Sequence, residues 1–438
     1  MNVLIKWCGI TSITLLFGVA QAIADDGKTD GQGHKEKFLY VWAGDQAHDS
    51  PDFLAVINFD ETSDDYGEVI NVVPLPPLDN GNTNTNNEPH HCHLSKDKNI
   101  LACGGLLSLL HSQNSIFFFD VSNPKTPQLI SSTKAVLSDI TDDFLPLDSG
   151  GFLVTNMGSD TGFTPGRLVE YDARLGLVDE WPILKPKDGS TLDAFNPHGV
   201  SARPEVNLMV TSDFIEPATT LNIVPGDPVV RSSVRVWNFN ERRITKTIPV
   251  VSPNTSSGGI GTMDIKLIPH DPKKRAFTAG MFDGWVYLID TKKGLSTPVF
   301  DCETIEPHVD VPVRGGMIQI LDVTKTGKPR LLTGAFQAGQ IIMLDTSNPE
   351  KPKQAAVVSL GVGAGPHSIA LTKDDKRLVV TDYFLNQDDF GKIHFEGDHK
   401  VHVIKVGEHS LELDTRFKLD FNTAFPSGPA RPHGVAMK

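Results

Sequence analysis

Short apolar runs that alternate with polar turns recur along the whole chain. One unit consists of an apolar strand, a turn that usually holds Asp or Asn, and a second strand. Two more expected strands, again joined by a polar turn, precede most of these units, as in "PHGVSARPEVNLMVTSD" and "PHSIALTKDDKRLVVTDY". The unit appears seven times, at intervals of about 50 to 65 residues, and begins at Phe53, Ser115, Arg167, Ser233, Trp285, Gln340 and Val401. Four strands in each repeat of this length are typical of the blades of a β-propeller.

The two ends of the repeat region complement each other. The last residues, "ARPHGVAMK", form a first strand with no partner after it, and "KFLYVWAGD" from Lys37 forms a second strand with no first strand before it. Pairing them would complete one blade and remove exposed sheet edges. We therefore predict an all-β, seven-bladed β-propeller over residues 37–438, closed by pairing of the C-terminal strand with the N-terminal strands. A β-sandwich fits less well, because it does not explain seven matched units with complementary ends.

The segment before the repeats has the pattern of a secretory signal peptide. Lys6 precedes an apolar stretch from Trp7 to Val19, and Ala20, Ala22 and Ala24 offer small residues for cleavage. We predict a signal peptide over residues 1–24, a polar linker over residues 25–36, and a periplasmic or secreted mature protein without membrane insertion. An uncleaved anchor fits less well, because the apolar run is too short to span a bilayer comfortably.

Composition narrows the function classes. The chain has 438 residues, of which 39% are hydrophobic and 21% charged, so it can bury a core. Its net charge of −14 makes nucleic acid an unfavourable partner. The sequence has no P-loop, H-E-x-x-H, C-x-x-C or G-x-S-x-G motif.

Three cysteines follow the predicted signal peptide, namely Cys92, Cys103 and Cys302. An odd number leaves at least one thiol unpaired within the chain. A regular hairpin around residues 96–98 would place His91 opposite Cys103, so that Cys92 and Cys103 would point to opposite faces of the sheet. This register predicts no disulfide between them. Cys92 is then interpreted as a small buried residue rather than a redox partner or a metal ligand.

Histidines recur at one point of the repeat. Four expected first strands begin with Pro-His, which places His90, His198, His367 and His433 at equivalent positions, and His91 adds a fifth imidazole. In a propeller the first strands line the central channel and run in the same direction, so these side chains should converge at one end of the axis. Several neutral imidazoles around one point are suitable ligands for copper, iron or zinc.

Carboxylates stand near the same repeat position. Glu88, Asp142 and Asp264 could orient the imidazoles from behind. The alternative interpretation is that the polar side chains at the blade starts only satisfy backbone groups around the channel. We favour a bound metal, because four Pro-His pairs share one position. His394, His399 and His402 are interpreted as solvated surface residues.

These residues carry a resemblance to a known family. The segments "EPHHCHLSKDKNILACGG", "RPEVNLMVTSDFIEP", "LLTGAFQAGQIIMLDTSNPEKPKQ", "DDKRLVVTDYFLNQDDFG" and "ARPHG" are similar to those of the selenium-binding protein family, whose bacterial members include periplasmic methanethiol oxidases. The resemblance covers nearly the whole mature chain. It implies a seven-bladed propeller with copper held by histidines at the axis. His90, His91 and His433 match the family motif, whereas a further family histidine aligns near Asp142.

The resemblance also implies an activity. Family members of this kind oxidise methanethiol with O2 and release formaldehyde, hydrogen sulfide and hydrogen peroxide. His198 and His367 stand where the family's usual residues are not histidine, so they are candidates to replace the missing ligand. We therefore expect an oxidase of a small thiol that uses O2 and copper, with iron or zinc as the less favoured metals. The alternatives are a non-enzymatic propeller that binds metal, selenium or a partner, an iron-dependent propeller oxygenase, and a lactonase-like hydrolase.

Overall fold

The computed structural model describes residues 35–182, 194–221, 227–254, 259–387 and 392–438. The expected signal peptide and residues 25–34 of the expected linker lie outside this part of the chain. Lys35–Lys438 form one compact unit. No helix within the described residues is long and apolar enough to cross a membrane.

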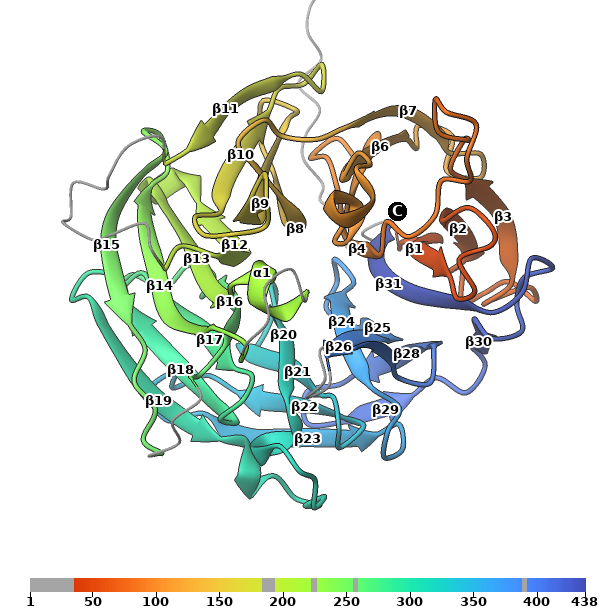
Figure 1. Cartoon of the computed structure of the whole chain (residues 1–438). Helices are drawn as coiled ribbons and strands as arrows, with labels where there is room; N and C mark the ends of the chain where they lie inside the picture. The colour runs from red at the N-terminus through yellow and green to blue at the C-terminus, as the bar shows by residue number, and fades with distance from the viewer. Residues whose placement is uncertain (1–34, 183–193, 222–226, 255–258, 388–391) are drawn as a thin grey trace, which may run out of the picture. The chain divides into compact units, whose positions relative to one another are not determined.

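Seven antiparallel sheets form the blades of this unit. Six have four strands, and the seventh has five because two short strands share its outer edge. The innermost strand of each blade contacts the innermost strand of the next (Figure 1). The predicted seven-bladed β-propeller is therefore confirmed. The innermost strands are β4 (Pro89–Leu94), β8 (Ser138–Pro146), β12 (Pro197–Arg203), β16 (Thr262–Leu267), β20 (Ile318–Val323), β24 (Pro366–Leu371) and β31 (Ala430–Met437).

The second and third strands of the blades are largely buried because they pack between neighbouring blades. The second strands are β5 (Ile100–Gly105), β9 (Phe152–Ser159), β13 (Leu208–Ile215), β17 (Arg275–Gly280), β21 (Arg330–Ala335), β25 (Arg377–Asp382) and β1 (Phe38–Asp45). The third strands are β6 (Ile116–Asp120), β10 (Arg167–Tyr171), β14 (Val230–Asn238), β18 (Trp285–Asp290), β22 (Gln340–Asp345), β28 (Lys400–Val406) and β2 (Phe53–Asn58).

The outer strands are the more exposed strands of the blades, and in β3 and β7 exposed and half-buried residues alternate, as in a sheet with one solvated face. They are β7 (Gln128–Thr133), β11 (Leu177–Trp181), β15 (Arg243–Pro249), β19 (Leu295–Asp301), β23 (Lys353–Ser359), β29 (Leu411–Leu413) with β30 (Leu419–Asp420), and β3 (Val69–Pro74). A separate hairpin, β26 (Phe384–Gln387) and β27 (Ile393–Glu396), follows β25. The helical segments are short: α1 (Pro217–Thr220), η1 (Ser108–His111), η2 (Pro204–Val206), η3 (Cys302–Thr304) and η4 (Arg314–Gly316).

The C-terminal strand closes the ring, as predicted. Strand β31 pairs antiparallel with β1, so that one blade contains both ends of the unit. Leu39 lies opposite Met437, and Asp45 lies opposite Ala430. This pairing removes the edge that an open ring of sheets would expose.

Every innermost strand carries one extra residue near its start. In β4, three steps along the strand from Pro89 to Cys92 correspond to two steps along β5 from Gly105 to Cys103. The same one-residue shift occurs in the other six blades. Such β-bulges bend the strand and change the direction of the side chains beside them.

The turn of this hairpin corrects the prediction about the cysteines. Ser95 pairs with Ile100 across a turn of residues 96–99, one residue longer than expected, so that Cys92 lies directly opposite Cys103. The two residues form a disulfide that packs in the apolar cluster around Trp42 and Phe117. Cys302 is a buried free thiol.

Carboxylates tie neighbouring innermost strands together. Asp143 of β8 accepts a hydrogen bond from the backbone N–H of Val200 in β12 at 3.0 Å. Asp264 of β16 accepts one from Leu321 in β20 at 2.9 Å. Asp322 of β20 repeats this contact with Leu371 in β24 at 2.8 Å.

The Cys92–Cys103 disulfide should stabilise the fold. It joins residues 11 positions apart, and closing a loop of this length lowers the entropy of the unfolded chain by an amount worth about 3 kcal/mol. Metal-free protein should therefore unfold at a lower urea concentration when a reductant is present. The double variant Cys92→Ala/Cys103→Ala should unfold at the same concentration with and without reductant, while Cys302→Ala keeps the difference. A wild-type curve that reductant leaves unchanged would contradict this assignment.

Candidate metal centre

The β-bulges place histidines from four blades at one end of the axis. The first bulge residue is His90 in β4, His198 in β12, His367 in β24 and His433 in β31. All four side chains are buried, with at most 3% exposure. Residues up to 343 positions apart in the sequence thus meet in one cluster.

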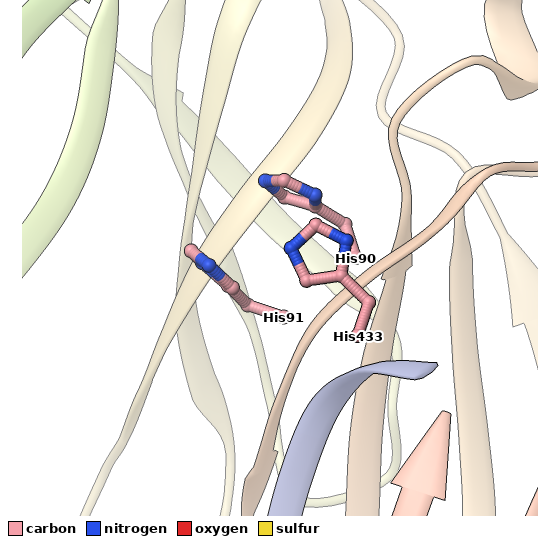
Figure 2. A group of neighbouring side chains, drawn as sticks. All are labelled: His90, His91 and His433. Atoms are coloured by element: carbon pink, nitrogen blue, oxygen red, sulfur yellow. The ribbon is translucent and has the colours of Figure 1, made fainter. Parts of the chain in front are cut away.

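His91 joins the cluster because of the bulge. Consecutive residues of a regular strand point to opposite faces, but the extra residue in β4 lets His90 and His91 face the same site. Their rings stack with centroids 4.4 Å apart. The ring of His433 lies 4.1 Å from that of His90 and 5.5 Å from that of His91, and Figure 2 shows the three rings grouped together. The ring of His367 lies 4.6 Å from that of His433.

Glycine follows two of these histidines for a steric reason. A Cβ atom at Gly434, after His433, would lie 2.2 Å from the carbonyl oxygen of His90. A Cβ atom at Gly199, after His198, would lie 2.3 Å from a carboxylate oxygen of Asp264. The Pro-His-Gly sequences therefore allow the innermost strands to approach closely enough for the rings to meet.

Asp142 is the first bulge residue of β8 and lies within the cluster. Its carboxylate oxygens are 3.2 Å from Nε2 of His90, Nδ1 of His91 and Nε2 of His198. Burial alone would raise the pKa of Asp142, but the charges of His198 and His90 outweigh burial and hold that pKa well below its usual value. A buried anion thus stands beside three imidazoles.

Burial governs the protonation of the histidines. It lowers the pKa of His198 to about 4 and holds the pKa values of His367 and His433 well below the usual value. Burial also lowers the pKa of His90. At His91, burial acts in the same direction, but the hydrogen bond and charge of Asp142 outweigh it and raise the pKa. Most of these rings are therefore neutral near pH 7, which is the form that binds metals.

Gln319 of β20 is a site residue that the sequence analysis missed. It is the first bulge residue of its blade, and its Oε1 lies 2.8 Å from Nδ1 of His367. Since the Gln319 amide nitrogen donates to the carbonyl of Met317, Oε1 is placed to accept from Nδ1. This leaves Nε2 of His367 with a free lone pair facing the cluster. The alignment of "MIQI" with the Pro-His strands could have revealed it.

Two of the predicted supporting carboxylates lie behind the cluster and not in it. Asp264 occupies the second bulge position of β16, where Met263 is the first, and it bonds Leu321 and the Lys266 ammonium. Glu88 precedes the Pro-His of β4, and its carboxylate pairs with Arg431 at 3.0 Å and accepts from the hydroxyl of Tyr383. Glu88 therefore links the segments that carry His90 and His433.

His399 and His402 lie in surroundings that differ from the solvated surface expected for them. His399 is buried, with 5% exposure, so its interpretation as a solvated residue is wrong. His402 is half-buried beside Asp382. The loop after β26 lies partly outside the described residues, but Phe384 of β26 packs its ring 5.0 Å from that of His367.

The cluster has the chemistry of a metal site. His90, His91 and His433 form one set of donors, and His90, Asp142 and His198 form another; in each, the ligand atoms lie within 4.8 Å of one another. Among the described residues, neither ring nitrogen of His433 nor Nε2 of His367 has a hydrogen-bond partner. Buried polar atoms almost always have a hydrogen-bond partner. The unpaired nitrogens are therefore what is expected of ligands to a metal cation.

Two cavities reach the cluster. A small one of about 50 Å³ touches His90, Asp142 and His198, and its other walls are mainly apolar, with Met157, Phe214, Leu221 and Phe384 among them. A larger one of about 580 Å³ touches His91 and His198 and continues past Asp143, Asp264 and Lys266. The cluster thus separates a small apolar chamber from a larger channel with both polar and apolar walls.

The fold and this cluster define a seven-bladed β-propeller with a histidine-rich candidate metal centre on its axis. The family model described as "56kDa selenium binding protein (SBP56)" matches residues 26–438, so the chain belongs to this family.

Relatives and structures agree with this assignment. The chain is 24% identical to methanethiol oxidase of Mus musculus, over 92% of this chain and 93% of that protein. It is 23% identical to methanethiol oxidase of Hyphomicrobium sp, over 89% of this chain and 84% of that protein. A solved structure of a hypothetical selenium-binding protein from Sulfolobus tokodaii shares the fold, with a TM-score of 0.71, 18% identity and coverage of 93% and 94%.

The depressed pKa values predict an acid-sensitive metal-free protein. Unfolded histidine titrates near 6.5, so between about pH 6.5 and 4 the unfolded chain binds protons that folded His198 does not bind. The free energy of unfolding contributed by this residue should therefore fall as pH is lowered through that window, by roughly 3 kcal/mol in all. His198→Gln should reduce the loss of stability between pH 7 and pH 5, measured by urea unfolding of chelator-treated protein. The exposed control His409→Gln should leave it unchanged, and equal losses in His198→Gln and wild type would refute the assignment.

Proposed function

We propose that the protein is a metal-dependent oxidase of methanethiol or a related small thiol, with O2 as the oxidant and copper as the metal. The observation that carries the proposal is the cluster of buried, mostly neutral imidazoles that opens onto a small apolar chamber. Relatives along nearly the full length of the chain that bear the name methanethiol oxidase support it. Copper and other late first-row metals prefer imidazole ligands.

The chamber supports a small substrate. A volume of about 50 Å³ leaves room for roughly four water-sized groups. Methanethiol has two non-hydrogen atoms, and the apolar walls formed by side chains such as Met157 and Phe214 suit its methyl group. Glutathione is too large and too polar to enter.

The residues of the axial cluster would have different roles at the metal centre. His90, His91 and His433 would hold the metal, with His198 and His367 completing the shell where the family histidine is replaced by Asp142. A bound copper ion supplies the redox chemistry and favours the thiolate form of a sulfur ligand. Asp142, which contacts three imidazoles, orients them and would balance the charge of a bound metal. Its carboxylate also lines the wall of the apolar chamber.

The overall reaction balances as a two-electron oxidation of the methyl carbon. Methanethiol, O2 and water give formaldehyde, hydrogen sulfide and hydrogen peroxide, so that the C–S bond breaks and O2 takes up two electrons and two protons. The larger channel on the side of His91, which carries Asp143, Asp264 and Lys266, offers water and the polar products a route that avoids the apolar chamber. We place this activity in the periplasm, because of the signal-peptide pattern of residues 1–24.

Oxygen consumption with methanethiol tests the proposal. Copper-loaded protein should consume O2 only when methanethiol is present and should form sulfide and peroxide in equal amounts, whereas glutathione should give no reaction. His433→Ala should retain less than about a tenth of the copper and of the rate, because it removes a ligand with two bare ring nitrogens. His409→Ala, at an exposed position, should match the wild type in both.

Two results would contradict the proposal. One is copper-loaded protein that shows no methanethiol-dependent O2 consumption, which would favour a non-enzymatic propeller that binds metal or selenium. The other is a folded His433→Ala variant with full copper content and full rate.

A further inference from the structure

A second group of donor side chains lies in the blade built from β24, β25, β28 and β29. Asp382 ends β25, Asp398 lies in the turn before β28, and His402 lies in β28. One ligand atom from each of the three lies within 4.8 Å of the others. None of these residues belongs to the axial cluster.

The second group lies on the other face of its sheet. Thr381 and Tyr383, the neighbours of Asp382, contact His433: the Thr381 hydroxyl donates to its carbonyl at 2.8 Å, and the Tyr383 ring lies 5.4 Å from its ring. Because side chains alternate along a strand, Asp382 points away from the axial cluster. A cation bound by Asp382 would therefore be separate from a metal at the axis.

The carboxylate of Asp382 is buried and poorly satisfied. Its side chain has 0% exposure, and neither of its oxygens accepts a hydrogen bond from any described residue. Nε2 of His402 lies 2.9 Å from Oδ2 and is itself without a well-formed hydrogen bond among these residues. A buried carboxylate in this state is strongly unfavourable unless a cation or a proton neutralises it, and burial raises the pKa of Asp382 to about 7.

The protein's own cations only partly meet this need. Lys400 pairs with Asp398 at 2.7 Å, and its side chain is 42% exposed. Protonated His402 would neutralise one oxygen of Asp382 and leave Oδ1 bare. A metal ion at the centre of the group would contact an atom of each side chain at once.

We propose that Asp382, Asp398 and His402 form a second metal site that binds a divalent cation of the Zn²⁺ class. One imidazole nitrogen and two carboxylate oxygens form a donor set that Zn²⁺ accepts, and a water molecule would fill the fourth position. The partial exposure of Asp398 and His402, at 27% and 17%, provides an entry path.

The site would act as a clamp within its blade. It joins the end of β25 to β28 and to the turn that precedes β28. Asp382 lies opposite Pro366, and Pro366 directly precedes the axial residue His367. A bound cation would therefore stabilise the strand pair that positions His367, whatever reaction the axial centre performs.

Anomalous diffraction at the zinc edge tests the proposal directly. Crystals of the wild-type protein grown with Zn²⁺ should show a peak between Asp382, Asp398 and His402, and this peak should persist in His433→Ala. It should disappear in His402→Gln and in Asp382→Asn. The control His409→Gln should keep it.

Calorimetric titration with Zn²⁺ gives the matching result in solution. His402→Gln should weaken binding at this site at least about tenfold, since even a lost contact behind the ligands costs 10–100-fold. His402 is partly exposed, so this variant should fold, which circular dichroism verifies. A wild-type crystal without a peak at millimolar Zn²⁺ would overturn the proposal and leave an ion-pair network only. An unchanged peak in folded His402→Gln would overturn it as well.

Discussion

The β-bulge at the start of every innermost strand is the constraint on which the candidate centre depends. A regular strand would send His90 and His91 to opposite faces, and it would turn the side chains of the other blades away from a common point. One extra residue per strand redirects these side chains toward the axis at the same height in each blade. Closure by β31 then fixes the distance between His433 and His90, because β31 completes its blade beside β4.

Burial and the lack of partners give this arrangement its chemistry. Removing imidazoles from water keeps most of them neutral, and the described residues around them supply too few hydrogen-bond partners for their nitrogens. Such a cluster is unfavourable in the metal-free protein and favourable around a cation. Asp142 adds a buried negative charge near the position where the resemblance to the family placed a histidine. The site therefore has a carboxylate there in place of a neutral imidazole, together with two additional histidines, His198 and His367.

The repeat pattern was sufficient to predict the architecture, because strand length, turn residues and complementary ends are local features of the sequence. It also predicted which histidines stand at equivalent positions. It did not predict the bulges, since an extra residue in one strand of a hairpin leaves no mark on the alternation of short apolar runs. The wrong prediction about Cys92 and Cys103 has a different cause: the turn of their hairpin spans residues 96–99 and not 96–98, which moves the pairing by one residue.

The missed bulges also affect the expectations for the centre. Asp264 was expected near the repeat position of the Pro-His histidines, but Met263 is the first bulge residue of β16 and Asp264 binds the next blade. Gln319 was missed because it lacks the Pro-His sequence, although its contact with His367 orients that ring. His399 was misjudged because it packs against Tyr383 and accepts a hydrogen bond from the backbone N–H of Phe421, and both residues approach it only in the folded blade.

X-ray absorption spectroscopy at the copper edge tests the central claim, that the axial imidazoles hold a metal. The account predicts a first shell that includes at least three imidazole nitrogens at about 2.0 Å, with the outer-shell scattering of histidine rings and no sulfur ligand, because Cys92 and Cys103 are joined to each other. A shell of oxygen atoms without histidine scattering would contradict it and would mean that the blade-start histidines serve only the packing of the channel.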